Sequence, residues 1–348
     1  MTDVRAVTAP PVEIPTVDLR AESARARQQL REAGHQVGFF YLTGHGVPPD
    51  LVTRMLDAAR RLFGLPQPDK DAVAMVRSPH FRGYTRLGGE LTRGEVDWRE
   101  QIDVGPERAP IDGLDKTDYR WLQGPNQWPA ALPELAGLVE EWDAALSAVA
   151  RTLLRHWAAS LGSPPAVFDA SFADAPATLI KIIRYPGRAA SAQGVGAHRD
   201  SGVLTLLLAE PGSTGLQVRR GGGGASPDDG WIEVPPREGA FIVNIGELLE
   251  VATRGYLRAT EHRVNLCGQA GERISVAFFF NPRLDARIPA LSLPDELAAR
   301  TDQHWTPSHD PADPMFSVYG RNAWKSRLRA HPDVAAAHGY SAERLENG

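Results

Sequence analysis

The sequence predicts a mixed α/β protein of the α+β type, in which a helical N-terminal region precedes an all-β core. Two observations lead to this prediction. Residues up to about 165 carry segments with helical periodicity, whereas residues 177–281 form short strand-like runs separated by Gly, Pro and Asp. Such a series of short strands is typical of a sandwich, a jelly roll or a barrel. The 348-residue chain is 42% apolar and 23% charged, which excludes disorder for most of its length.

Three helices and one buried strand are expected in the N-terminal region. Residues 21–35 are rich in Ala, Arg, Gln and Glu and end near a glycine. Residues 37–42, Val-Gly-Phe-Phe-Tyr-Leu, form an apolar run of strand length. Residues 50–63 place Leu, Met and Phe roughly on one side of a helix. The longest helix is expected over residues 132–161, where apolar residues recur at steps of three and four and predict a face packed on the core.

The strands of the core follow one another closely. The expected strands are residues 179–185, 204–209, 216–220, 231–234, 240–244, 259–266 and 273–280. The glycine run at residues 221–224 is expected to be a loop, because a phosphate-binding loop would open directly into a helix. The chain then becomes Pro-rich and ends in a helix near residues 323–329. We therefore expect an N-terminal region at 1–165 packed on a core at 166–282, followed by a tail at 283–348.

Composition and charge exclude several classes of function. Cys267 is the only cysteine, so an intrachain disulfide and a zinc site of several thiolates are excluded. The net charge of −5 gives no general attraction for nucleic acid or an anionic membrane. Residues 1–15 lack the apolar core of a signal peptide, and no apolar run approaches the length of a membrane span. We expect a cytoplasmic protein that binds a small molecule, and the sequence leaves its oligomeric state open.

A candidate metal site begins at His198-Arg199-Asp200, among the strands of the core. On a strand, residues i and i+2 point to the same face, so this His and Asp can bind one metal ion. His262 follows in another strand-like run and can supply a third ligand. A second triplet of this kind, His331-Pro332-Asp333, lies in the polar tail, and we interpret it as a surface coincidence.

Two His and one carboxylate are the facial triad that binds Fe(II) in non-haem oxygenases, and up to three metal positions stay open. A 2-oxoacid can take two of these positions and dioxygen the third. A 2-oxoacid with a second carboxylate also needs an anchor away from the metal. Arg273 offers a planar fork that matches a carboxylate, and Ser275 shares its strand face and can donate one more hydrogen bond.

Together with their neighbours, these motifs resemble the isopenicillin N synthase-like branch of the Fe(II)- and 2-oxoglutarate-dependent oxygenases. The resemblance covers most of the chain. In the N-terminal region it rests on Ile14-Pro15-Thr16-Val17-Asp18-Leu19 and on residues 38–48. In the core it rests on Arg184-Tyr185-Pro186 and on residues 196–200, 215–218, 243–250, 261–264, 273–275 and 278–282.

The resemblance implies a distorted double-stranded β-helix, also called a jelly roll, with helical additions at the N-terminus and a helical C-terminal tail. It also implies that Fe(II) is bound by His198, Asp200 and His262. Dioxygen and 2-oxoglutarate would then be the cosubstrates of the enzyme.

For 2-oxoglutarate, the resemblance implies that Arg273 and Ser275 bind the distal carboxylate with help from Tyr185. Many members of the family carry an Asn two residues before this Tyr, where the present chain has Ile183. Strand alternation puts Lys181 on the same face, so we expect its side chain to reach the pocket instead.

The implied reaction is the oxidation of an unactivated C–H bond by hydroxylation, desaturation or ring closure, with no catalytic residue beyond the metal ligands. Two alternatives stay open. Some relatives keep the triad and the Arg-x-Ser pair but hold the substrate's own carboxylate there, and oxidise it with Fe(II) and O2 without 2-oxoglutarate. The other alternative is a non-catalytic jelly-roll binding protein, against which the intact triad argues.

Six side chains are candidates for contact with the substrate, because the N-terminal region and the tail usually line the substrate entrance in this family. They are Arg82, Tyr84, Lys181, Phe279, Arg321 and Trp324. An arginine-lined pocket suits a substrate with a carboxylate. We therefore expect an amino acid or a peptide-like metabolite of specialised metabolism.

Overall fold

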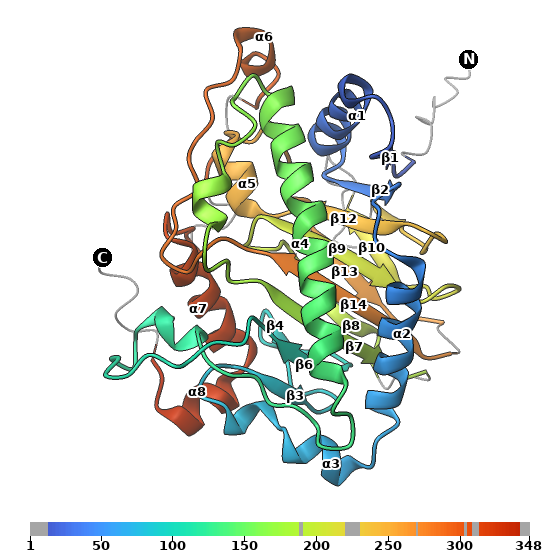
Figure 1. Ribbon diagram of the computed structural model, residues 1–348, viewed down its shortest axis with the longest axis vertical. Helices are drawn as coiled ribbons and strands as arrows, with labels where there is room; N and C mark the ends of the chain where they lie inside the picture. Colours follow the sequence, from blue (N-terminus) through green and yellow to red (C-terminus); the bar gives the residue numbers. More distant parts are fainter. Residues whose placement is uncertain are drawn as a thin grey trace, which may run out of the picture.

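Two β-sheets and a layer of helices make up the fold (Figure 1). The structure is a computed structural model that describes residues 13–187, 191–219, 230–268, 271–302, 305–307 and 313–341. The expected glycine loop at residues 221–224 lies outside the described residues.

The larger sheet has eight strands and draws them from both halves of the chain. In spatial order they are β1 (Thr16–Asp18), β2 (Phe39–Thr43), β12 (Phe241–Ile245), β9 (Leu204–Ala209), β14 (Arg273–Phe280), β7 (Leu179–Tyr185), β6 (Glu100–Val104) and β3 (Gly83–Thr85). Only β1 and β2 are parallel; the other pairs are antiparallel. The N-terminal strands thus extend the sheet of the core at both edges.

The smaller sheet faces the larger one. Its order is β11 (Trp231–Glu233), β10 (Leu216–Arg219), β13 (His262–Asn265) and β8 (Gln193–His198). Buried residues of both sheets form one apolar cluster, including Tyr185 and Ile242 from the larger sheet and Val195 and Val218 from the smaller. Two facing antiparallel sheets confirm the expected jelly-roll core, and the described strands do not close into a barrel. A separate hairpin consists of β4 (Leu91–Thr92) and β5 (Glu95–Val96).

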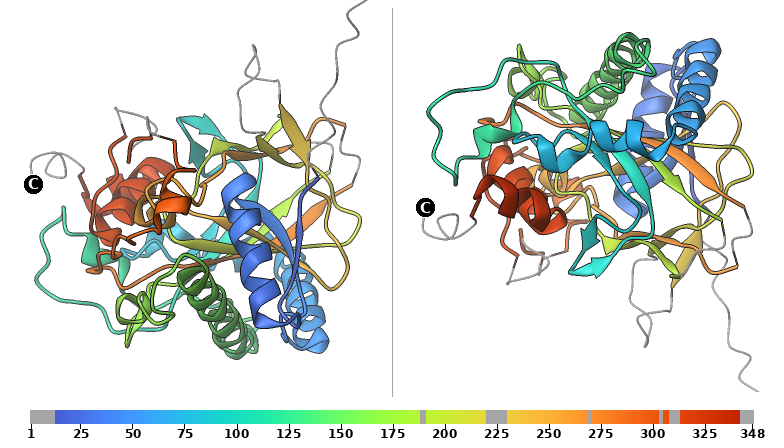
Figure 2. Two further views of the ribbon diagram at one scale, coloured as in Figure 1. Left: turned by 90° about the horizontal axis from the view of Figure 1, so that it is seen from above. Right: turned by 90° about the horizontal axis from the view of Figure 1, so that it is seen from below.

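Helices cover the outer face of the larger sheet (Figures 1 and 2). The longest is α4 (Leu135–Ser160), whose Trp142, Leu146 and Trp157 are fully buried in the main core. The other helices are α1 (Ser23–Gln36), α2 (Pro49–Phe63), α3 (Gln67–Ala72), α5 (Glu247–Ala252), α6 (Asp295–Ala298), α7 (Tyr319–Ala330) and α8 (Pro332–His338). Short 3-10 turns are η1 (Met75–Arg77), η2 (Tyr119–Leu122) and η3 (Asp169–Phe172). None of the helices described is both long and apolar enough to cross a membrane.

Most of the expected elements are present, with shifted ends. The strands predicted at 179–185, 204–209 and 273–280 have the bounds of β7, β9 and β14. The sequence analysis missed β8, because its Gln-Gly-Val-Gly-Ala-His sequence contains two glycines, and β6, because three of its five residues are polar. The interpretation of His331 as a surface residue was wrong: its side chain is 1% exposed and packs between α7 and the pocket wall.

Candidate metal and cosubstrate site

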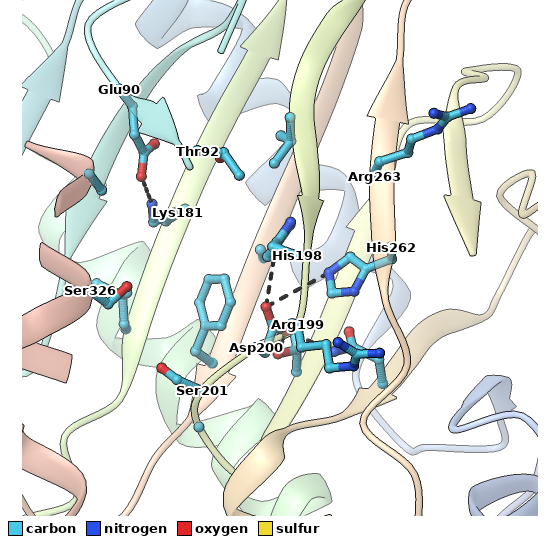
Figure 3. Close-up of a pocket in the computed structure, with 18 of the residues that line it drawn as sticks. Glu90, Thr92, Lys181, His198, Arg199, Asp200, Ser201, His262, Arg263 and Ser326 are labelled. Carbon is cyan, nitrogen blue, oxygen red and sulfur yellow. Dashed lines mark hydrogen bonds and ion pairs between the residues drawn. The ribbon is translucent and has the colours of Figure 1, made fainter. Parts of the chain in front are cut away.

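A cavity of about 860 Å³ opens between the two sheets. Strands β7 and β14 of the larger sheet and β8 and β13 of the smaller one contribute residues to its lining, and α7 contributes from the tail. Figure 3 shows His198, Asp200 and His262 converging in it, with Lys181 and Glu90 on the side away from His262. Residues far apart in the sequence therefore face one space.

The three expected metal ligands come together at one end of β8 and β13. His198 and His262 are opposite each other in the antiparallel register of these strands. The Nε2 atoms of His198 and His262 lie 3.5 Å and 3.7 Å from Asp200 Oδ1. All three ligand atoms lie within 4.8 Å of one another, which is close enough for one ion.

Hydrogen bonds fix which atom each ligand presents. Nδ1 of His198 lies 2.8 Å from the Gly196 carbonyl oxygen and Nδ1 of His262 lies 3.1 Å from that of Thr260. A proton held on Nδ1 by a carbonyl leaves the lone pair on Nε2, which is the atom that faces Asp200. The arrangement therefore presents two imidazole nitrogens toward one point.

The carboxylate of Asp200 is held in the same way. Its Oδ2 accepts hydrogen bonds from Thr205 Oγ1 at 2.5 Å and from Asn244 Nδ2 at 2.7 Å. Its Oδ1 is left facing the two histidines. One oxygen and two nitrogens on one side of a common point are the donor set of a 2-His-1-carboxylate Fe(II) site, so these residues fit the metal.

Electrostatics favour the ligand form of Asp200 and His262. For His198, burial would lower the pKa, but the hydrogen bond and the charge of Asp200 raise it. Burial alone would raise the pKa of Asp200, but His262 and His198 hold it well below its usual range. Burial and the neighbouring His198 lower the pKa of His262 to about 4. Asp200 is therefore ionised and His262 neutral at neutral pH, as metal binding requires.

The expected 2-oxoglutarate residues are also adjacent. Arg273 and Tyr185 are paired across β14 and β7, and the guanidinium lies 4.8 Å from the ring centre. Arg273 Nη1 is 3.5 Å from Ser275 Oγ. Arg273 is 2% exposed, and among the described residues no carboxylate is paired with it. A buried guanidinium without a counter-ion is costly, so this site fits a carboxylate supplied by a ligand.

Lys181 reaches the cavity, as strand alternation predicts, and its ammonium forms ion pairs there. Its Nζ is 2.6 Å from Glu90 Oε1 and 3.6 Å from Asp103 Oδ2. Ile183 lines the same face and offers no polar atom. Phe279, the second predicted substrate residue on these strands, also lines the cavity.

The other four predicted substrate residues do not line the cavity. Arg82 is buried and donates to the Leu122 carbonyl at 2.9 Å. The Tyr84 hydroxyl donates to Glu100. Trp324 is fully buried in a separate aromatic cluster around α7, and Arg321 stacks on a ring at the tail.

A group of buried charged residues at the cavity escaped the sequence analysis. It consists of Glu90, Arg99, Asp103, Arg327 and His331. One signal could have found part of it: Arg99, Gln101 and Asp103 alternate along the DWREQIDV segment, which puts all three on one strand face. Arg327 and His331 join the group only because the C-terminal tail packs against the cavity wall. No local sequence pattern indicates this packing.

Comparison with known proteins agrees with this geometry. Residues 14–131 match the family model described as non-haem dioxygenase in morphine synthesis N-terminal, and residues 177–282 match the 2OG-Fe(II) oxygenase superfamily. The 2-oxoglutarate-dependent dioxygenase frbJ of Dothideomycetidae sp. (strain 11243) is 32% identical over 92% of this chain and 90% of its own. A homoarginine-6-hydroxylase of Arabidopsis thaliana is 33% identical over 78% of this chain and 80% of its own.

The fold has solved counterparts as well. A 2OG-Fe(II) oxygenase family protein from Caulobacter crescentus superposes with a TM-score of 0.70 at 24% identity, over 91% of this chain and 98% of its own. This likeness concerns the fold alone. The comparisons concern the wider superfamily, and the isopenicillin N synthase-like branch stays a prediction.

Proposed function

Because this chain belongs to the Fe(II)- and 2-oxoglutarate-dependent oxygenases, we propose that it oxidises an unactivated C–H bond of a small amino-acid-like or peptide-like metabolite. Its cofactor is Fe(II), and its cosubstrates are 2-oxoglutarate and O2. In this proposal His198, Asp200 and His262 hold the metal, and Arg273, Ser275 and Tyr185 hold 2-oxoglutarate. The oxidation is a hydroxylation, a desaturation or a ring closure.

One observation carries the assignment of residues: the buried, unpaired guanidinium of Arg273 lies in the same cavity as the triad. Its neighbour Ser275 adds a hydroxyl on the same strand face. An anion with one end at Arg273 and the other toward the triad is the shape of a 2-oxoacid with a distal carboxylate. This arrangement supports the use of 2-oxoglutarate over the alternative without it.

The bound iron and 2-oxoglutarate supply the oxidising power, with 2-oxoglutarate decarboxylated to succinate as O2 is consumed. The protein's own residues perform binding, orientation and exclusion of water. Thr205 and Asn244 keep Asp200 oriented, and Phe279, which is opposite Thr205 in the sheet, provides an apolar wall beside the triad. In this proposal no side chain has to act as a general base.

The class of substrate is inferred from relatives and from charge. The Arabidopsis relative is named for homoarginine, an amino acid. The net charge of −5 gives no reason to expect nucleic acid or a membrane as partner. We propose that the protein acts on a free metabolite in the cytoplasm.

The residue assignment is tested by the affinity for 2-oxoglutarate. Calorimetric titration of the Mn(II)-loaded protein should show saturable binding that Arg273→Met weakens by about 100-fold, since a charge-assisted bidentate contact is lost. Arg321→Met is the matched control, because this arginine lies outside the cavity. Equal affinity in wild type and Arg273→Met would refute the assignment.

The substrate class is tested by succinate release. Amino acids, including L-homoarginine and L-arginine, and short peptides are screened with Fe(II) and 2-oxoglutarate, and turnover without added substrate is subtracted. An amino acid or peptide should raise the rate above this background. Stimulation only by compounds of other classes would contradict the proposed class while leaving the enzyme type intact.

A further inference from the structure

One wall of the cavity carries charged side chains that neither the triad nor the Arg273 site uses. Lys181 comes from β7, Arg99 directly precedes β6, and Glu90 directly precedes β4. Glu90 accepts from Lys181 Nζ at 2.6 Å through Oε1 and from Arg99 Nη2 at 2.7 Å through Oε2. The three side chains are only 6–10% exposed. Two cations therefore share one carboxylate at this wall.

The two carboxylates behind this wall are bound mainly by other groups. Asp97 accepts a hydrogen bond from the backbone of β8 at 3.1 Å, and its nearest oxygen is 3.5 Å from Arg99. Asp103 accepts from Arg327 at 2.5 Å and lies 3.6 Å from Lys181. A guanidinium has five donors and an ammonium three, so both cations keep donors in reserve. Among the residues that the structure describes, Arg99 Nε has no hydrogen-bond partner.

The charge of the whole lining also favours an anion. Cationic side chains outnumber carboxylates by nine to four among the residues that line the cavity. The cations are Arg93, Arg99, Lys181, Arg199, Arg263, Arg273, Lys325, Arg327 and Arg329, and the carboxylates are Glu90, Asp200, Glu247 and Asp313. Bound Fe(II) and 2-oxoglutarate carry opposite charges of equal size and leave this excess in place. Asp97, Asp103 and Glu261 pair with lining cations from behind and offset part of this excess, and the cations that remain favour an anionic ligand.

This wall borders the Arg273 site but consists of other side chains. Tyr185, Ile183 and Lys181 follow one another on the cavity face of β7. At about 3.3 Å per residue, Lys181 lies about 13 Å along the strand from Tyr185. On β7 the residue between them is the apolar Ile183, and Phe279 lies beyond Lys181, opposite Leu179. The cavity thus has an anion site at the Tyr185 end of β7 and, past Ile183, the ammonium of Lys181. Arg99 comes from the Tyr185 end, since the following Glu100 pairs with Arg184, and its side chain meets Lys181 at Glu90.

We propose that Lys181 and Arg99 bind a carboxylate of the oxidised substrate in competition with Glu90, which bridges the two cations. This inference rests on the proposed function, because it takes the molecule that fills the cavity to be the one that is oxidised. The substrate carbon chain then runs from this carboxylate over Leu179 and Phe279 toward the triad, because Phe279 is opposite Thr205, which donates to Asp200. Specificity for an acid over its neutral amide follows from this placement.

The probes are hexanoate and hexanamide, which have the same length and differ in charge. The full chain is loaded with Mn(II) and saturating 2-oxoglutarate, and broadening of the terminal methyl signal of each probe by the bound Mn(II) is followed by NMR. Hexanoate should bind at least about tenfold more tightly than hexanamide, the factor expected for one charge-assisted hydrogen bond. Equal binding of the two probes, or no binding of hexanoate, would overturn the inference.

Two variants should change this preference in opposite directions. Lys181→Met removes one cation and should lower hexanoate affinity about tenfold without affecting hexanamide. Glu90→Gln keeps the shape but removes the internal competitor for both cations, so hexanoate should bind more tightly. A purely structural role for this wall would weaken binding in both variants, and that result would overturn the inference.

Lys325→Met is the matched control, since Lys325 lines the same cavity and is paired with Asp313. Its hexanoate affinity should equal that of wild type, and a loss as large as in Lys181→Met would contradict the assigned place. Affinity for 2-oxoglutarate is measured on every variant. Failure of wild type to bind 2-oxoglutarate would refute the proposed function; normal 2-oxoglutarate binding without an acid preference would refute this inference alone.

Discussion

Thr205 and Asn244 set the orientation of the Asp200 carboxylate toward the metal position, although neither is itself one of the three expected metal ligands. Both donate to Oδ2 and so leave Oδ1 facing His198 and His262. Hydrogen bonds of this kind fix the orientation of a ligand and keep it basic. The geometry of the triad therefore depends on β9 and β12 as much as on β8 and β13, which carry the histidines.

Thr205→Val should weaken Fe(II) binding by about 10-fold to 100-fold, because the valine cannot donate to Asp200. The dissociation constant for Fe(II) is measured anaerobically by competition with a chelator. Thr205→Ser keeps the hydroxyl and is the control. If Thr205→Val binds Fe(II) as tightly as wild type and Thr205→Ser, the hydroxyl does not position the carboxylate.

Glu90 should make stability depend on pH on the acid side. Burial would raise its pKa, but Arg99, Lys181 and His331 hold it well below the usual 4.5. A carboxyl whose pKa is lower in the folded state stabilises the protein above about pH 4.5, and this contribution is lost as the pH falls through the folded-state pKa. Removing the carboxylate removes the dependence.

Glu90→Gln should lower the free energy of unfolding at pH 7 by about 3 kcal/mol, because a buried ion pair is broken. Between pH 7 and pH 3 the variant should then lose less stability than wild type. Urea unfolding of the metal-free protein at several pH values measures both effects. Parallel pH profiles for the two proteins would show that Glu90 does not titrate differently on folding.

The functional residues differ in how far the sequence reveals them. His198, Asp200, His262 and Arg273 belong to motifs with regular strand spacing, and the fold brings them to one cavity. Arg82 was predicted to contact substrate, but its guanidinium is used by the carbonyl of Leu122. An arginine chosen because its region usually lines the substrate entrance carries no information about its partner, whereas a strand period fixes the face on which a residue lies.

At the scale of elements, α7 is the helix that completes the cavity from the tail. It contributes Tyr319, Ser326 and Arg327 to the lining, and Arg327 ties it to Asp103 of β6. Its other anchor is Trp324, which is fully buried against Phe81 and Tyr340. The Arg327–Asp103 ion pair and the aromatic cluster around Trp324 therefore attach this helix to the N-terminal region.

Trp324→Ala should cost about 3–5 kcal/mol of packing and loosen α7. Hydrogen exchange of the α7 amides should become faster, while Fe(II) and 2-oxoglutarate affinities stay unchanged, because the residues assigned to them lie outside α7. Turnover of the primary substrate should fall. Unchanged protection of α7 in the variant would contradict this anchoring role.

Strands of buried apolar residues were predicted from the sequence. Strands near the site that contain glycines or polar residues were not. β14 and β7 are rich in Ile and Phe and were predicted with the observed bounds. β8 carries Gly194, which packs tightly against Tyr185 and Val264, and Gly196, so its sequence lacks strand formers. β6 carries charged and amide groups such as Asp103, which is buried only because Arg327 of the distant α7 pairs with it.

For the whole molecule, the larger sheet joins parts that the sequence suggested as separate regions. β12 pairs with β2, and β7 pairs with β6, so N-terminal strands flank the core strands on both sides. The main apolar core likewise combines α4 with β9 and β14. Regions that share a sheet and a core are expected to fold as one unit.

A fragment of residues 166–282 should therefore not fold alone. It would expose the edges of β12 and β7 and the apolar face that α4 covers, which favours aggregation. The amide NMR spectrum and urea unfolding of the fragment measure this. A dispersed spectrum with cooperative unfolding would contradict the single-unit description.

The central claim is that the triad binds Fe(II) for use with 2-oxoglutarate. Addition of Fe(II) and 2-oxoglutarate to the protein without oxygen should produce a weak visible charge-transfer band at one equivalent of metal. Asp200→Ala should abolish the band, and Asp333→Ala, at the exposed Asp of the second His-x-Asp triplet, should retain it. A wild-type protein without the band, or an Asp200→Ala variant with the full band, would contradict the claim.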